Sequence, residues 1–517
     1  MAQDGGKVHI AIVGGGIAGL ALGAGLKKKD NVTFHIYESV PEFKDVGAGL
    51  ALHMNAIKAM ALIGEEVKQT YFNKALFMGE EDKEMSTEVI LAQGPNQGEL
   101  VAELGKAKGR KTVARSALLD GLLELVPKEK ISFGKRLESI DESDSGVRMK
   151  FKDGSEAKAD CMIGADGIHS LTRRYVLGAD HPATEPKNHD GWQIYRTMVS
   201  ADFAKQHINP KWTQQVPILL GPRGHVNCIP LDKGTRLSAG VAVRGAKFTE
   251  TGEAPPLDPE LYKDYSEEAQ QIVRLVARDT SASWTAADHD HAPVYFRGRV
   301  AMMGDAAHAS MPFAGNGAAQ ALEDSAVLDH LFSRVTSPDQ IEAAFSAYDT
   351  TRRPRSQAVV DLARKFGRVY AYAEEGMHED PAKMKQFFGG AAAFTNNADL
   401  QRQNEDAMKL FMTAVQGGAS GAEVKVEDAV DLCTVRRKLN PNATRMVRGI
   451  QLGHEVETLL VDGLAPDHRV PDDLEDGVVE EAGVEEGAVG EVEGLHRPVD
   501  AVCYCFAVAQ ALASGMD

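Results

Sequence analysis

The first forty residues of the chain place three consecutive glycines between a short apolar run and a stretch of small residues. Val8–Val13 is β-branched and apolar, as in a buried parallel strand. Residues 14–19 read GGGIAG, and small residues with helical spacing continue from there to about Lys29. A second β-rich run, Val32–Tyr37, ends at Glu38. This order predicts a strand–turn–helix–strand unit of the kind that builds a parallel sheet.

The spaced glycines of this turn indicate a phosphate-binding function. Gly14 permits the tight turn, Gly16 lets the backbone approach a pyrophosphate, and Gly19 lets the helix pack closely on the strand. Backbone N–H groups and the positive end of the helix dipole then meet the diphosphate. Glu38 can accept hydrogen bonds from an unphosphorylated ribose. The unit therefore predicts an ADP-containing dinucleotide, either NAD or FAD; the alternative is a glycine-rich turn with a structural glutamate.

A second strand–turn–helix pattern lies far along the chain. Residues 299–308, RVAMMGDAAH, predict a strand that ends at Gly304-Asp305. The small-residue loop 312–319, PFAGNGAA, then leads into a helix. This arrangement resembles the second FAD fingerprint of flavoprotein monooxygenases, and it favours FAD over NAD as the ligand of the first unit.

Three further segments strengthen that resemblance. Residues 161–170 contain an Asp-Gly pair, Arg115 opens an amphipathic helix after a short β-run, and residues 46–52 carry a Gly-Ala-Gly stretch. Together with the two glycine turns, they are similar in order and spacing to the single-component FAD-dependent aromatic-ring hydroxylases. The salicylate-hydroxylase-like branch is the nearest in pattern, and the resemblance covers about residues 7–370.

The resemblance assigns cofactor roles to residues in each motif. Asp305 would bind the ribitol hydroxyls, and the backbone of Gly317 and Ala318 would face the pyrimidine edge of the flavin. There the positive end of a helix would stabilise the negative charge of the reduced flavin. The other cofactor-binding residues that it implies are Asp166, for the pyrophosphate region and NAD(P)H use, Arg115, for the diphosphate side, and Ala51, beside the cofactor.

The resemblance also implies a reaction. NAD(P)H would reduce the FAD, O2 would form a C4a-hydroperoxide, and one oxygen atom would pass to a small phenolic or hydroxybenzoate-like substrate. An FAD-dependent epoxidase, an isoprenoid reductase and a non-catalytic flavin-binding protein remain as alternatives. The sequence leaves open the exact substrate, the choice between NADH and NADPH, and the oligomeric state.

Arg196 is the candidate catalytic residue on the substrate side. It ends the run Gly191–Arg196, which matches a strand where relatives place a substrate-facing arginine, and a guanidinium there could hold a phenolate or carboxylate. The alternative is a surface arginine on an edge strand. Relatives often carry a tyrosine ahead of a later Pro-Leu pair, but the run Val226–Leu231 has none, so a mechanism through that tyrosine does not carry over.

Two other parts of the sequence carry residue types that are common at catalytic or metal-binding sites. His308 could act as a general base, or it could pack beside the flavin loop. Residues 288–291, Asp-His-Asp-His, contain metal-ligand types, but no second cluster of ligands accompanies them. We therefore predict no metal site.

The motif order predicts an α/β fold with an interrupted cofactor domain. Because 517 residues exceed the roughly 250–300 of a single core, at least two packed units are expected. A Rossmann-like FAD-binding domain would comprise residues 1–185 and 291–370, with an antiparallel-sheet substrate domain, 186–290, inserted between the two parts. A C-terminal helical region, 371–470, and an acidic, disordered tail, 471–517, would follow.

The composition excludes several classes of partner. A net charge of −18 disfavours binding to nucleic acids and anionic lipids, although ten acidic residues of that excess lie in residues 471–494. No run reaches the roughly 18–20 apolar residues of a membrane span. Five cysteines without C-x-x-C spacing indicate a reducing compartment, and the cluster Lys27–Lys29 after the first apolar segment disfavours a secretory signal. We expect a cytoplasmic protein.

Overall fold

The computed structural model describes residues 6–43, 49–249 and 252–419, and all of them belong to one structural unit. The predicted acidic tail, 471–517, lies outside the described residues. So do residues 420–470 of the predicted helical region and residues 46–48 of the Gly-Ala-Gly stretch.

The chain has the predicted α/β fold, and its first sheet is almost entirely parallel. In spatial order the strands are β18 (Phe296–Arg297), β19 (Val300–Met302), β12 (Cys161–Gly164), β1 (Val8–Val13), β2 (Val32–Tyr37) and β8 (Ile131–Ser132). Only β18 pairs antiparallel with its neighbour. Val13 is in register with Gly164, and Gly164 with Met302, so three strands end together at one edge.

Small side chains allow two helices to pack closely on this sheet. Helix α1 (Ile17–Leu26) is buried on all sides, and α9 (Gly317–Phe332) packs beside it. Ser325 Oγ donates to the carbonyl of Ala18 at 3.1 Å, which ties the two helices together. An apolar helix with no polar face is expected in a core of this kind.

The second large sheet has seven strands. They are, in spatial order, β17 (Trp284–Thr285), β13 (Gln193–Ser200), β16 (Arg236–Val243), β15 (Gly224–Leu231), β14 (Val216–Gly221), β5 (Glu84–Leu91) and β6 (Leu100–Lys108). Within residues 186–290, where the sequence predicts an antiparallel sheet, β13, β16, β15 and β14 pair antiparallel in that order. Strands β5 and β6 join it because β5 pairs in parallel with β14, although the sequence division places residues 84–108 in the first cofactor segment.

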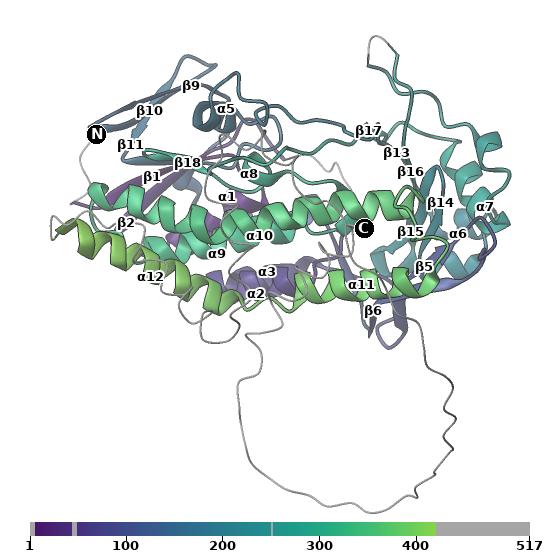
Figure 1. Ribbon diagram of the computed structural model, residues 1–517. Coiled ribbons are helices and arrows are strands. Elements are labelled where there is room, and N and C mark those ends of the chain that lie inside the picture. The colour runs from purple at the N-terminus through teal and green to yellow at the C-terminus, as the bar shows by residue number, and fades with distance from the viewer. Residues whose placement is uncertain (1–5, 44–48, 250–251, 420–517) are drawn as a thin grey trace, which may run out of the picture. The chain divides into compact units, whose positions relative to one another are not determined.

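The two faces of this sheet pack against different partners. On β15, Val226 and Cys228 belong to a core with α7 (Glu267–Val276). Since side chains alternate along a strand, His225 and Asn227 point to the opposite face. That face meets the C-terminal half of α10 (Ile341–Tyr370), which runs there from beside the parallel sheet (Figure 1).

The remaining elements surround these two sheets. They are β9 (Leu137–Ser143), β10 (Gly146–Phe151) and β11 (Glu156–Ala159) in one small sheet; β3 (Gly49–Leu50), β7 (Lys111–Ala114) and β4 (Leu76–Phe77) in another; and helices α2 (Met54–Ile63), α3 (Glu65–Lys74), α4 (Arg115–Leu125), α5 (Leu171–Leu177), α6 (Ala201–Lys205), α8 (Asp305–His308), α11 (Pro381–Asn396) and α12 (Leu400–Ala419). Among the described residues, no helix is long and apolar enough to cross a membrane.

Gly14→Ala is expected to destabilise the protein, because Gly14 has φ +113° and an added Cβ would lie 2.1 Å from the carbonyl oxygen of Ala165. Strain of this kind costs about 2–4 kcal/mol of unfolding free energy. Urea denaturation of the apoprotein measures the change. Gly16→Ala is the matched control, since an added Cβ there meets no atom within 4 Å. Equal stability of the two variants would contradict this account of the turn.

Candidate functional site

The three glycine-containing turns predicted from the sequence meet at one edge of the parallel sheet. The Ala165 N–H donates to the carbonyl of Val13 at 2.7 Å, and the Met303 N–H donates to that of Gly164 at 2.9 Å. The turns that follow β1, β12 and β19 therefore lie next to one another. Ligands of open parallel sheets bind outside the carboxyl ends of the strands, and these turns occupy that position.

The glycines of the first turn have two different roles. Some lie where any side chain would clash with the backbone, and one lies where the space is open. An added Cβ on Gly19 would lie 2.0 Å from the carbonyl oxygen of Gly14, so α1 could not pack as it does with a larger residue there. Gly16, at the start of α1, has open space around the Cβ position instead. The protein backbone at Gly16 is open to the pyrophosphate that the sequence predicts there, while Gly14 and Gly19 shape the turn.

Glu38 follows β2 and turns toward this glycine turn. Its Oε2 accepts a hydrogen bond from the Gly15 N–H at 2.5 Å, and its Oε1 accepts one from the Val40 N–H at 2.8 Å. The residue is buried, with 8% of its surface exposed. Glu38 is thus beside the turn, where a ribose would lie if the diphosphate met α1.

Asp166 is close to the first turn, but its carboxylate is engaged within its own loop. Its Oδ1 accepts from Ser170 Oγ at 2.5 Å, and its Oδ2 accepts from the backbone N–H of Thr172 at 3.0 Å. These contacts hold the N-terminus of α5. Because the carboxylate is already engaged, the predicted contact with the pyrophosphate region would have to come from the backbone of this loop, which touches Gly14.

Asp305 and Arg115 are a free carboxylate and a free guanidinium at the same edge. Both side chains are exposed, and neither has a hydrogen-bond partner among the described residues. Protein nevertheless surrounds Asp305 closely enough that burial raises the pKa of its carboxyl, while the charges of His308 and Arg115 act in the opposite direction. Accessible, unpartnered groups of opposite charge are suited to the hydroxyls and phosphates of a bound cofactor.

The loop before α9 brings the remaining cofactor candidates to this region. Gly317 and Ala318 are the first residues of α9 and are partly exposed, and the first N–H groups of a helix have no partner within it. An added Cβ on Gly315 would lie 3.3 Å from Nε2 of His53, which precedes α2. Ala51, also exposed, stands two residues before His53. The residues present therefore fit an extended, anionic cofactor such as FAD, with open backbone at Gly16 and unpaired charges at Arg115 and Asp305.

An aromatic cluster separates this loop from the seven-stranded sheet. Phe313 of the loop packs against Trp192, with ring centroids 4.4 Å apart, and meets the ring of His225 edge-on at 5.5 Å. Tyr370 of α10 lies 4.9 Å from His225 on another side. An added Cβ on Gly367 would lie 2.6 Å from Phe313, so α10 approaches these rings only because that position lacks a side chain.

His225 is the titratable group at the centre of this cluster. The residue is buried, and its Nδ1 is buried without a hydrogen-bond partner among the described residues. Burial lowers the pKa of His225 to about 4, so the imidazole is neutral near pH 7 and offers an acceptor nitrogen. Sequence reasoning missed this residue, although the alternation along residues 224–231 places it opposite the buried Val226 and Cys228.

Arg196 lies on the same face of the sheet, two strands away from His225. It is in register with Gly240 of β16, which is in register with Asn227 of β15. Its guanidinium carbon is 5.0 Å from the ring centroid of Trp284, and its Nε is buried without a partner. Burial lowers the pKa of the Arg196 guanidinium. The structure does not place Arg196 in contact with the aromatic cluster, so its predicted substrate contact remains a prediction.

His308 and Asp288, the first residue of the Asp-His-Asp-His run, each pair with an internal partner, whereas His291 of the run is exposed. His308 is buried, and its Nε2 is 2.6 Å from Asp324 Oδ2. Asp288 pairs with Arg364, whose Nε donates to Asp288 Oδ2 at 2.6 Å. His308 thus contacts Asp324 of α9, and its two sequence interpretations remain predictions. Within the described part of the chain, no group of three metal-ligand residues is close enough to hold an ion.

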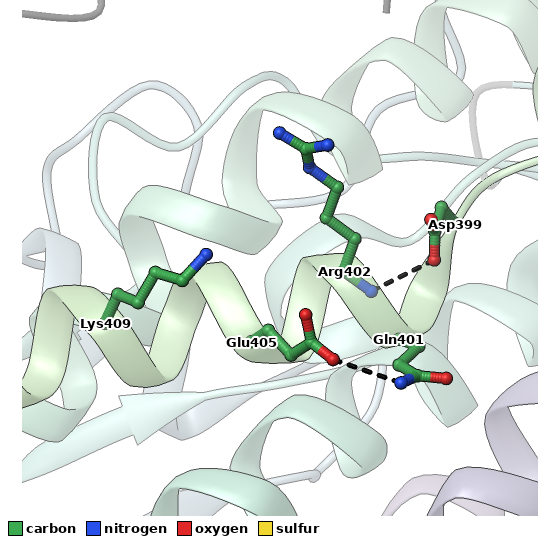
Figure 2. A pocket seen from close by; sticks show the side chains of 5 residues that line it. All are labelled: Asp399, Gln401, Arg402, Glu405 and Lys409. Atoms are coloured by element: carbon green, nitrogen blue, oxygen red, sulfur yellow. Dashed lines mark hydrogen bonds between the residues drawn. The ribbon is translucent and has the colours of Figure 1, made fainter. Parts of the chain in front are cut away.

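A hollow on the surface of α12 differs in its lining and its exposure from the site at the strand ends. Figure 2 shows it lined by Asp399, Gln401, Arg402, Glu405 and Lys409. The backbone N–H of Arg402 donates to Asp399 at 3.0 Å, and Gln401 donates to Glu405 at 3.1 Å. The lining is polar and open to solvent, and it includes none of the residues at the strand ends. We do not assign the functional site to it.

Comparisons with known proteins agree with the cofactor fit. A family model described as an FAD-binding domain matches residues 7–363. The 6-methylsalicylate 1-monooxygenase of Aspergillus terreus is 35% identical over 429 residues, which are 81% of this chain and 95% of that protein. A salicylate hydroxylase of Pseudomonas putida is 31% identical over 388 residues, 70% of this chain and 85% of that protein. A solved substrate complex of salicylate hydroxylase, 28% identical, superposes with a TM-score of 0.67 over 78% of this chain and 98% of its own.

Arg115→Ala is expected to raise the dissociation constant for FAD about tenfold, because the charge-assisted contact to the diphosphate that the sequence predicts for Arg115 would be lost. The unfolding free energy of the apoprotein should not change, since Arg115 is exposed and has no partner among the described residues. Fluorescence titration of apoprotein with FAD measures the constant. Arg174→Ala, which removes an exposed arginine paired with Glu185, is the control. An unchanged affinity in Arg115→Ala would contradict the predicted contact between Arg115 and the diphosphate.

Proposed function

The chain belongs to the FAD-binding-domain family and is an FAD-dependent monooxygenase, and on that premise we propose that it hydroxylates a small phenolic or hydroxybenzoate-like substrate. NAD(P)H would be the reductant and O2 the oxygen source. Bound FAD would supply the oxygen-transfer chemistry, through the C4a-hydroperoxide that the family resemblance implies. The protein's own groups must then bind the ring, bring it to the flavin and activate it.

The buried imidazole of His225, with Nδ1 unpartnered and with Phe313 and Tyr370 against its ring, is the observation that carries this proposal. A phenol hydroxyl that donates to the free ring nitrogen would lie beside Phe313, at the loop that leads to Gly317 and Ala318. A general base works best when it is unprotonated and within hydrogen-bond reach of the proton it accepts. Partial removal of that proton makes the ring electron-rich, which favours attack by an electrophilic oxygen.

The rings around His225 support the exclusion of water. Trp192, Phe313 and Tyr370 form an apolar wall against which an aromatic substrate can stack. A dry site prolongs the life of a reactive oxygen species and strengthens each polar contact within it. A small planar ring is therefore the substrate shape that this wall favours.

Arg196 is the second polar group that we assign to the substrate side. It faces the same side of the sheet as His225, and no side chain stands between it and Asn227, because Gly240 occupies the position between them. A carboxylate or phenolate oxygen could reach its guanidinium when the ring lies against this face. The names of the similar enzymes, which act on salicylates, support a substrate that carries both a hydroxyl and a carboxylate.

We expect the purified, full-length protein to be yellow and to oxidise NAD(P)H faster when a suitable phenol or hydroxybenzoate is added. A substrate panel with product mass spectrometry tests this, with hydrogen peroxide measured to detect uncoupled turnover. A gain of one oxygen atom supports hydroxylation, whereas a gain of hydrogens alone would indicate a reductase. A protein that stays colourless in excess FAD would contradict the proposal.

His225→Gln is expected to lower kcat/KM about a hundredfold, because the proton acceptor is lost while a polar side chain is kept.

The His225→Gln substitution should also weaken the pH dependence of the unfolding free energy. The unfolded state takes up a proton at His225 near pH 6.5 and the folded state only near pH 4, so stability falls as the pH falls between these values. His225 contributes up to about 3 kcal/mol of this loss.

Steady-state kinetics and urea denaturation across this pH range check both effects. His291→Gln, which removes an exposed histidine at the surface, is the control. If His225→Gln kept wild-type kcat/KM on the best substrate of the panel, His225 could not be the proton acceptor.

A further inference from the structure

We propose that Arg352 is a positioning residue for the bound FAD. It joins the Gly304-Asp305 turn to the loop before α9, and it balances two carboxylates beneath the N-terminus of that helix. The inference rests on the proposed function in one respect, that FAD lies along these two segments. It adds a residue of α10 that lies in neither glycine turn.

The contacts of Arg352 are all internal. Its side chain is 0% exposed, and its guanidinium donates from Nε to Asp324 Oδ1 at 2.8 Å and from Nη1 to Glu323 Oε2 at 2.7 Å. Its Nη2 donates to Gln320 Oε1 at 2.7 Å. A single planar fork thus spans two adjacent carboxylates of α9, a geometry that a lysine cannot reproduce.

One branch of this network leads to the Gly-Asp turn. Asp324 Oδ2 accepts a hydrogen bond from the Gly304 N–H at 2.8 Å and lies 2.6 Å from His308 Nε2. Gly304 is the residue just before Asp305, and His308 is at the other end of the short helix that Asp305 begins. The position of the Asp305 carboxylate therefore depends on Asp324, which Arg352 holds.

The other branch leads to the loop before α9. Glu323 Oε1 accepts from Asn55 Nδ2 at 2.9 Å, and the same nitrogen donates to Asn316 Oδ1 at 2.9 Å. Asn316 precedes Gly317, the first residue of α9. Arg355 also donates to Glu323, from Nε at 2.7 Å. Arg352 thus reaches both segments that are proposed to hold the flavin, one through each carboxylate.

The charges in this network matter as much as its contacts. Burial opposes the ionisation of Glu323 and Asp324, but the neighbouring cations outweigh it and lower both pKa values, that of Asp324 to about 2. Both carboxylates are therefore ionised, and their residues lie roughly 9–10 Å along the helix axis from its first residue. Without compensation they would oppose the positive helix end, where negative charge on the reduced flavin is stabilised. Arg352 supplies one of the compensating charges.

Loss of the Arg352 charge should therefore change the flavin in two ways. The Gly304 and Asn316 branches would relax, so FAD would bind more weakly. An unbalanced carboxylate would disfavour the anionic reduced flavin, so the reduction potential would become more negative. If Arg352 only supported the fold, its substitution would change the stability of the protein. The reduction potential of the flavin would then not vary with the net charge of the network.

The experiment compares wild type, Arg352→Gln and the double variant Arg352→Gln/Asp324→Asn, each as the full-length chain reconstituted with FAD. We expect Arg352→Gln to raise the FAD dissociation constant about tenfold or more and to shift the reduction potential to more negative values. In the double variant, which restores the net charge, the potential should return toward that of wild type. Arg353→Gln is the matched control, because it removes the adjacent arginine, whose partner is Asp349.

Two results would overturn the proposal. One is an Arg352→Gln protein with the affinity and potential of the Arg353→Gln control, and the other is a double variant no closer to the wild-type potential than the single variant. If Arg352→Gln does not fold, the proposal is tested with Arg352→Lys, which keeps the positive charge but loses the planar guanidinium that bonds to both carboxylates. Weakened FAD binding at wild-type potential then supports the proposal, and wild-type affinity overturns it. Wild-type protein that binds FAD but hydroxylates nothing would refute the proposed function alone.

Discussion

The close approach of backbone at the ends of β1 and β12 is the constraint on which the rest of the structure depends. Gly14 and Ala165 come together so tightly that no side chain fits between them, and Gly164 is bonded to Met303 on the other side. This contact brings three turns, separated by more than a hundred residues of sequence, to one edge of the sheet. An accessible glycine, a carboxylate and a guanidinium are then available to one extended ligand. Without this convergence, the three motifs would be unrelated turns.

Helix α10 connects the two halves of the candidate site. In its N-terminal half, Arg352 holds both carboxylates of α9, and near its C-terminal end, Gly367 admits Phe313 beside His225. A rigid helix of this length can keep the cofactor side and the aromatic wall in a constant relation. The reaction needs such precision, because oxygen transfer demands that a ring carbon lie close to the reactive flavin atom. In this account, binding of cofactor and binding of substrate depend on one continuous element.

The sequence allowed the strands and helices of the cofactor side to be predicted, because their signals are local. Consecutive residues determine both the turn at Gly14 and Gly16 and the helix start at Arg115. The predicted strands and helices and the FAD-binding family are confirmed. The substrate side was harder to predict. The pairing of β5 with β14 joins distant segments, and the importance of His225 depends on burial, which no local pattern reports. The network around Arg352 was not predicted, since its members are spread over four elements.

The central claim is that this protein transfers one oxygen atom from O2 to an aromatic substrate. The most direct test is turnover under isotopically labelled O2 with the best substrate of the panel, followed by mass spectrometry of the product. The account predicts one labelled oxygen atom per product molecule, formed with consumption of NAD(P)H. A product without the label, or NAD(P)H consumption that yields only hydrogen peroxide with every phenol tested, would contradict it.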